Sequence, residues 1–140
     1  MLQNEYHLLE RSDFEGELQR LCLAEGIGAL PYFGLASGYL TGKYRSEADY
    51  GKSIRGDRMA KYVQGRGPAV LAALDQIAAE TGATQAQIAL AWLAAQPAVA
   101  APIASARTPE QLEELLGAME LELSEAQLAR LDAASSPDSD

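Results

Sequence analysis

Residues 30–44 read Leu30-Pro-Tyr-Phe-Gly-Leu-Ala-Ser-Gly-Tyr-Leu-Thr-Gly-Lys-Tyr44. The stretch begins as an apolar strand candidate and passes into a loop that carries glycines, aromatic rings, a hydroxyl group and a lysine. Glycine lets the backbone adopt conformations closed to other residues and approach a ligand closely. Binding residues are also concentrated on loops that a rigid scaffold positions. The stretch therefore predicts a strand followed by a ligand-binding loop.

Two further segments have the pattern of short strands. Residues 2–8 precede a helical pattern that the Ser12-Asp13 pair would cap, with Phe14 in its first turn and Gly26 at its end. Residues 27–32 form the strand that enters the loop. Residues 99–104 are apolar throughout, as strands covered on both faces are. Residues 45–66, by contrast, are polar with little periodicity, which predicts a long, mobile loop.

Helical patterns fill most of the second half of the chain. Each begins with an N-terminal signal, which is either Gly67-Pro68 or a Thr or Ser cap. The helices are expected over residues 67–81, 84–96, 108–119 and 124–134.

The order strand, helix, strand, two helices, strand, two helices predicts parallel strands joined by right-handed crossovers. We expect the α/β class and the C-terminal part of a TIM (β/α)8 barrel, with about three parallel strands and outer helices. A complete barrel needs about 250 residues, whereas this sequence has 140. We expect one partial α/β-barrel domain over residues 1–134 and a disordered polar tail over 135–140. An incomplete barrel exposes apolar edges, so we expect a homo-oligomer or a missing N-terminal half.

The composition limits which binding partners and which cellular location can be expected. The formal net charge is −9, which makes nucleic acids and anionic membranes poor partners. No apolar run is long enough to span a membrane, and the first residues lack a signal-peptide pattern, so a cytoplasmic protein is expected. The single cysteine, Cys22, is interpreted as a core residue. No Cys/His cluster has metal-ligand spacing, and no metal site is expected.

Three motifs resemble those of aldo-keto reductases, in particular the branch with a Leu-Thr-Gly-Lys-Tyr loop. The first is Leu2-Gln-Asn-Glu-Tyr-His-Leu-Leu-Glu-Arg11, which is similar to the family's sixth strand. The second is the opening stretch, which is similar to the loop after the seventh strand. The third is Pro102-Ile-Ala-Ser-Ala-Arg-Thr-Pro-Glu-Gln-Leu-Glu-Glu-Leu-Leu116, which is similar to the strand, turn and helix that bind the adenosine end of the cofactor.

The resemblance assigns the first two motifs to NADPH. Gln3 would hydrogen-bond the nicotinamide carboxamide, and Tyr32 would stack on the nicotinamide ring. Lys43 would pair with a phosphate oxygen. Alternatives remain for all three: Gln3 can satisfy a strand end, Tyr32 can be a core tyrosine, and Lys43 can be a solvated surface lysine. The family positions that follow the pyrophosphate match Phe33, Leu35, Ser37 and Gly38.

The third motif would bind the 2′-phosphate and the adenine. Arg107 offers a fork of donors just before a helix N-terminus, where backbone N–H groups and the helix dipole favour a phosphate. Gln111 and Glu114 match family positions near the same groups. Arg107 could instead pair with Glu110 or another local acid. In two positions the sequence departs from the family: Leu115 stands where Asn is frequent, and Ser105 stands where glycine is frequent and would be strained if the backbone required positive φ.

The resemblance implies the cofactor-binding half of an NADPH-dependent oxidoreductase that reduces small-molecule carbonyls to alcohols. The family's catalytic Asp, Tyr, Lys and His belong to an earlier half that none of the motifs matches, so no catalytic residue is assigned. His7 is interpreted as a packed or surface residue, and the chain alone is expected to be nearly inert. One alternative is a catalytically inactive half-barrel that serves as a structural or dimerising nucleotide-binding module. Another is that the chain is one part of an ordinary enzyme.

Overall fold

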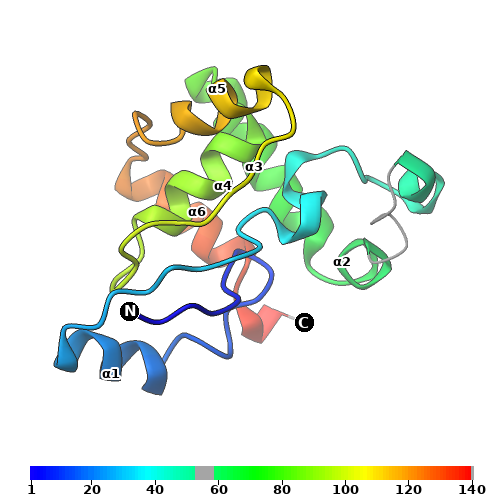
Figure 1. The fold of residues 1–140 in the computed structure, drawn as a ribbon. Helices are drawn as coiled ribbons and strands as arrows, with labels where there is room; N and C mark the ends of the chain where they lie inside the picture. Colours follow the sequence, from blue (N-terminus) through cyan, green and yellow to red (C-terminus); the bar gives the residue numbers. More distant parts are fainter. Residues whose placement is uncertain (53–58, 140) are drawn as a thin grey trace.

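The structure is a computed structural model that describes residues 1–52 and 59–139. Three extended segments lie beside a group of helices, and α2 (Ala60–Gln64) lies out to one side of them (Figure 1). The helices are α1 (Glu17–Glu25), α3 (Gly67–Thr81), α4 (Gln85–Ala94), α5 (Pro109–Gly117) and α6 (Glu125–Ala134), with 3-10 turns η1 (Ala36–Thr41), η2 (Glu47–Lys52) and η4 (Pro137–Ser139).

The extended segments are parallel and pair in chain order. Residues 28–32 form the middle segment. Leu2 donates its N–H to the carbonyl of Gly28 at 2.9 Å, and Leu30 donates back to Leu2 at 2.7 Å. On the other side, Ala29 bridges to Val99 in parallel orientation. The predicted parallel order of the three segments is therefore present.

Continuous strands are not present, however, because only isolated bridges join the described segments. Beyond the bridge at Ala29, the regular parallel register would require N–H donors at Pro31 and Pro102, and proline has none. The N–H of Ile103 donates to the carbonyl of Pro31 instead, at 2.8 Å. The predicted count of about three strands is therefore not confirmed, and the two prolines interrupt the ladder between residues 28–32 and 98–103.

Local sequence signals set one end of each of four helices. Thr84 and Ser124 each form a capping box with the glutamine three residues later, and Thr108 accepts the backbone N–H of Gln111. Gly82 ends α3 in the left-handed conformation, with φ 76°. The predicted helices over 67–81, 84–96, 108–119 and 124–134 are confirmed to within two or three residues at their ends.

Two predictions made from the first half of the chain need correction. The first helix begins at Glu17 and not near Phe14, because Phe14 is buried against Tyr6, with ring centroids 4.7 Å apart, in a turn that precedes Gly16. The segment 45–66 contains η2 and α2 among its described residues. Met59 and Tyr62 anchor α2 because both are buried. Residues 53–58 of the predicted loop lie outside the described residues.

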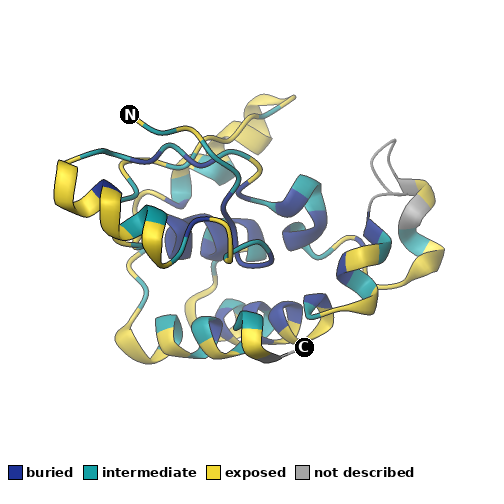
Figure 2. Cartoon of the chain, turned by 90° about the horizontal axis from the view of Figure 1, so that it is seen from below, coloured by how far each residue is buried: buried dark blue, intermediate teal, exposed yellow. Residues whose placement is uncertain are grey.

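The core lies between the extended segments and the helices, where buried positions of both gather (Figure 2). Helix α4 is apolar on nearly all sides and lies in contact with α3, α5 and η1. Trp92 of α4 is fully buried beside Tyr6, with ring centroids 5.7 Å apart, and its Nε1 donates to Asp132 of α6 at 2.8 Å. The interpretation of Cys22 as a core residue is confirmed, since it is buried.

Two arginines tie the N-terminal turn to the end of α6. Arg11 donates from Nη1 to the carbonyl of Asp132 and to Oγ of Ser135, both at 2.9 Å, while its Nε donates to Glu15 at 2.8 Å. Arg66 donates to the carbonyls of Leu9 and Ser136, both at 3.2 Å. Ser135 is fully buried, so the packed part of the chain extends to this residue.

Candidate functional site

A cavity of about 420 Å³ lies at the carboxyl ends of the segments 28–32 and 98–103, between η1 and α5. Ligand sites of α/β folds lie at this end of the strands. Gln3 does not line this cavity, although its neighbour Asn4 accepts the N–H of Tyr32 at 2.9 Å. Nine of the ten residues predicted to bind a cofactor do line it, namely Tyr32, Phe33, Leu35, Ser37, Gly38, Lys43, Arg107, Gln111 and Glu114.

The loop wall of the cavity is held in an unusual backbone shape. Phe33, Ala36 and Ser37 have φ of 57°, 51° and 57°, in the left-handed region that non-glycine residues seldom adopt. Such conformations persist where the surroundings over-determine them, and they concentrate at functional sites. Here Tyr39 is fully buried, and Oγ1 of Thr41 donates to the carbonyl of Gly38 at 2.7 Å. The loop is therefore anchored in the core by Tyr39 and braced by a hydrogen bond between two of its own residues.

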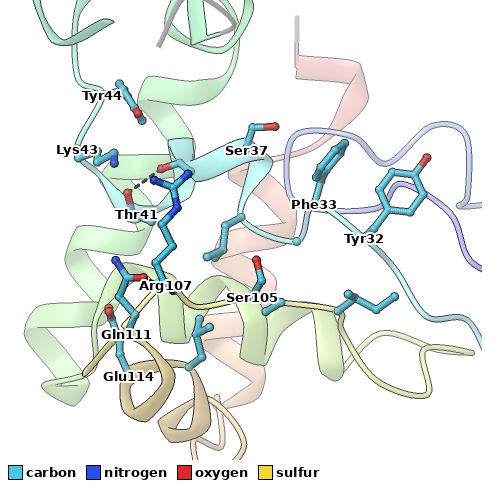
Figure 3. Close-up of a pocket in the computed structure, with 17 residues that line it drawn as sticks. Tyr32, Phe33, Ser37, Thr41, Lys43, Tyr44, Ser105, Arg107, Gln111 and Glu114 are labelled. Atoms are coloured by element: carbon cyan, nitrogen blue, oxygen red, sulfur yellow. Dashed lines mark hydrogen bonds between the residues drawn. The ribbon is translucent and has the colours of Figure 1, made fainter. Parts of the chain in front are cut away.

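The two ends of the cavity differ in their side chains (Figure 3). Tyr32 and Phe33 stand at one end, with ring centroids 5.1 Å apart in a T-shaped arrangement. Lys43 and Arg107 lie toward the other end, and Nζ of Lys43 is 5.2 Å from the ring centroid of Tyr44. The cavity can therefore hold an elongated ligand that is flat at one end and anionic at the other.

Arg107 is directed into the cavity, and its guanidinium makes no hydrogen bond or ion pair with any residue that the structure describes. The alternative pair with Glu110 is thus not formed. The backbone N–H of Arg107 donates to Oε1 of Gln111 at 2.8 Å, and the N–H of Gln111 donates to Oγ1 of Thr108 at 3.2 Å. These two backbone donors are engaged, so an anion here would depend chiefly on the guanidinium.

Comparison with known proteins identifies the family. The family model described as "Aldo/keto reductase family" matches residues 1–136. This chain belongs to that family. It is 37% identical over 134 residues to "Protein tas" of Escherichia coli (strain K12), covering 94% of this chain and 38% of the relative. It is 30% identical over 131 residues to "Aldo-keto reductase AMT2" of Alternaria alternata, covering 94% and 35% respectively.

A solved structure supports the same assignment. The thermostable aldo-keto reductase Tm1743, crystallised in complex with the inhibitor epalrestat, superposes with a TM-score of 0.66 at 30% identity. The match covers 94% of this chain and 38% of that chain, so this chain corresponds to part of an eight-stranded α/β barrel. Curated relatives and the solved neighbour are all much longer than the aligned region, since the chain spans under two fifths of each of them.

Aldo/keto reductases are oxidoreductases that generally use NAD(P)H and act on small-molecule carbonyls. No helix among the described residues is long and apolar enough to cross a membrane. The described residues also contain no cluster of metal-ligating side chains.

The structure answers the question raised by one departure from the family pattern. Ser105 lines the cavity but is not among the residues with positive φ, so serine is accommodated there without strain. Leu115 also lines the cavity and presents an apolar side chain. Sequence reasoning missed Thr41 and Tyr44, which line it as well. Thr41 could have been found from its place inside the glycine loop, whereas nothing in the sequence indicates that Tyr44 turns inward.

His7 lies outside the cavity and is fully buried. Its Nδ1 accepts the N–H of Leu9 at 3.2 Å, so Nε2 carries the proton and faces Glu5 at 3.2 Å. Burial lowers the pKa of His7 to about 4, with the hydrogen bond to Glu5 opposing this shift. The interpretation of His7 as a packed residue is confirmed.

The buried His7 makes stability depend on pH. The unfolded chain takes up a proton near pH 6.5, while the folded chain does so only near pH 4, so stability is lost as the pH falls between these values. Urea unfolding should therefore show about 2 kcal/mol less stability at pH 5 than at pH 7.5. A His7→Gln variant should lack this dependence. If wild-type and variant slopes are equal over this range, His7 is not the group responsible.

Proposed function

We propose that this chain binds NADPH as the cofactor-binding part of a carbonyl-reducing oxidoreductase. One observation carries the proposal. Nine residues, drawn from two motifs more than 60 positions apart, resemble the cofactor positions of the family and line one cavity. The roles assigned to single residues follow from the family resemblance and from their chemistry.

The charge of the cavity suits a phosphorylated ligand. It is lined by two cationic side chains, Lys43 and Arg107, and one carboxylate, Glu114, although the whole chain has a net charge of −9. An arginine fork matches phosphate geometry and lysine supplies a point charge. This local excess of positive charge supports the phosphorylated dinucleotide over the unphosphorylated one.

Each end of the cavity would do a different task. Tyr32 and Phe33 would give the nicotinamide a flat apolar contact and, with Gln3 at the adjacent segment end, fix the face that it presents. Arg107 would hold the 2′-phosphate, with Glu114 and the free amide nitrogen of Gln111 near the adenine. When bound, NADPH supplies a hydride to the carbonyl carbon of the substrate. The residues of this chain bind and orient; none is assigned to proton transfer.

The isolated chain should reduce carbonyls very slowly. Without a positioned acid it would lose a factor on the order of 10²–10⁴ from proton transfer.

A second candidate function is a catalytically inactive nucleotide-binding module that dimerises. Four large apolar side chains are exposed, namely Ile103, Leu112, Leu116 and Met119. Contact with another chain, or with a further segment of the barrel, would remove them from water.

The test is a titration of the purified chain with NADPH and with NADH, followed by nucleotide fluorescence, with the solution mass measured by light scattering on the same sample. We expect saturable binding that is at least about tenfold tighter for NADPH, which corresponds to one additional charge-assisted contact. A folded sample that binds neither nucleotide would contradict the proposal. An oligomer in that case would favour the structural module.

A further inference from the structure

Arg45 joins the glycine loop to α3 from outside the cavity. Its Nη1 and Nη2 donate to the two carboxylate oxygens of Asp75 at 2.8 and 2.9 Å. Its Nε donates to the carbonyl of Gly42 at 2.7 Å, one residue before Lys43. A single guanidinium thus bridges the end of the loop and a helix of the core, with the bidentate geometry that gives arginine–carboxylate pairs their directionality.

Asp75 is itself held by a second helix. Its Oδ1 accepts a hydrogen bond from Nε2 of Gln85, the first residue of α4, at 3.0 Å. The Arg45 guanidinium holds the pKa of Asp75 below its usual value, which keeps the carboxylate charged near neutral pH. The loop is therefore connected through Arg45 and Asp75 to both α3 and α4.

Gly42 fits this contact because it has no side chain. Its φ is 84°, and a Cβ placed there would lie 2.7 Å from Nη2 of Arg45. Tyr44, on the other side of Lys43, is buried with 1% of its surface exposed. Arg45 thus fixes the backbone before Lys43, and the burial of Tyr44 fixes the backbone after it.

We propose that Arg45 and Asp75 are positioning residues for the cofactor site, which hold residues 36–44 in the shape that binds the dinucleotide without touching it. This inference rests on the proposed function. Neither residue lines the cavity. Their side chains are 44% and 43% exposed, and exposed ion pairs contribute little to global stability. The value of the pair lies in preorganising the loop, because a loop that is already ordered has less freedom to lose on binding.

A second arginine–carboxylate pair on α3, of similar exposure but with a single hydrogen bond, provides the control. Arg130 of α6 donates to Glu80 of α3 at 2.7 Å, the side chains are 35% and 43% exposed, and Gln127 donates to the same carboxylate at 3.0 Å. None of the three residues lines the cavity. Both pairs thus join one arginine and one glutamine to an acid on α3, but only the Arg45 pair reaches the loop.

The experiment compares Arg45→Met, Asp75→Asn and the double variant with Arg130→Met and Glu80→Gln. Each single change at Arg45 or Asp75 should weaken binding of both NADPH and NADH about tenfold, with the double variant no weaker than the single ones. Thermal midpoints should stay within about 4 °C of wild type. The Arg130 and Glu80 variants should bind as wild type does. Unchanged affinity in the Arg45 and Asp75 variants would overturn the inference, as would an equal loss in the control pair.

Hydrogen exchange on the nucleotide-free chain separates this inference from the proposed function. Amides of residues 36–46 should exchange faster in Asp75→Asn than in wild type, and should be unchanged in Glu80→Gln. If wild type binds no nucleotide, the proposed function fails, and exchange alone then decides whether the pair orders the loop. Identical exchange in Asp75→Asn and wild type would overturn the role of the pair.

Discussion

Replacing Arg107 by alanine should weaken NADPH binding by about 10- to 100-fold, the size of a lost charge-assisted hydrogen bond. The guanidinium points into the cavity and makes no hydrogen bond or ion pair with the described residues, so its donors are available for a phosphate. NADH lacks the 2′-phosphate. Its affinity should therefore change by less than about threefold, because it never made the lost contact.

The measurement is a paired titration with both nucleotides. Arg107→Lys should give an intermediate NADPH affinity, since lysine keeps the charge but loses the fork. Arg130→Ala is the matched control, because Arg130 is an arginine of α6 that does not line the cavity. Equal losses of NADPH and NADH in Arg107→Ala would remove Arg107 from the 2′-phosphate role.

The largest effect on stability is expected from Trp92→Ala. The ring is fully buried among Tyr6, Arg11 and the α6 residue Asp132, so the substitution leaves a cavity and an unpaired carboxylate oxygen. Large-to-small changes of this kind cost about 3–5 kcal/mol, against a total stability of about 5–15 kcal/mol for an ordinary domain. The variant should be largely unfolded at the wild-type urea midpoint.

Circular dichroism is the right probe for this comparison, because Trp92 is the only tryptophan of the chain and its fluorescence disappears with the substitution. Trp92→Phe keeps one aromatic ring in the core but loses the hydrogen bond to Asp132 and part of the indole volume, so it should cost less than the alanine change. A loss below about 1 kcal/mol for Trp92→Ala would show that α4 does not form the centre of the core.

Most helix ends could be predicted because their signals are local. A threonine or serine cap and a glutamine three residues later specify a helix start without help from the rest of the chain, as at Thr84 and Ser124. The start of α1 could not be predicted in this way. Phe14 fits a helical pattern, but it lies in a turn before the helix and packs in the core against Tyr6. Tertiary packing outweighed periodicity there. Helix α2 was missed for a different reason: its stretch has little periodicity, and Tyr62 is held by packing against Tyr39, with ring centroids 5.4 Å apart.

The candidate site was predictable to the extent that it is made of contiguous motifs. Residues 32–43 and 107–114 each carry several site positions in one short stretch, and the parallel order of the segments brings their ends together. The Arg45–Asp75 pair was not predictable, because its partners stand 30 positions apart and neither belongs to a motif. The interruption of the ladder at Pro31 could have been anticipated, since a proline within a strand pattern removes a donor.

The hydrogen bonds between Arg11 and the end of α6 can form only late in synthesis. The acceptors, the carbonyl of Asp132 and Oγ of Ser135, lie 121 and 124 positions later in the chain. Trp92 likewise cannot donate its hydrogen bond to Asp132 until the chain is 40 residues longer. While the chain is still emerging from the ribosome, the N-terminal turn and α4 have no α6 to close against, and their apolar faces stay open to other proteins. The side chains of this turn and of α4 are thus covered only after α6 has been made.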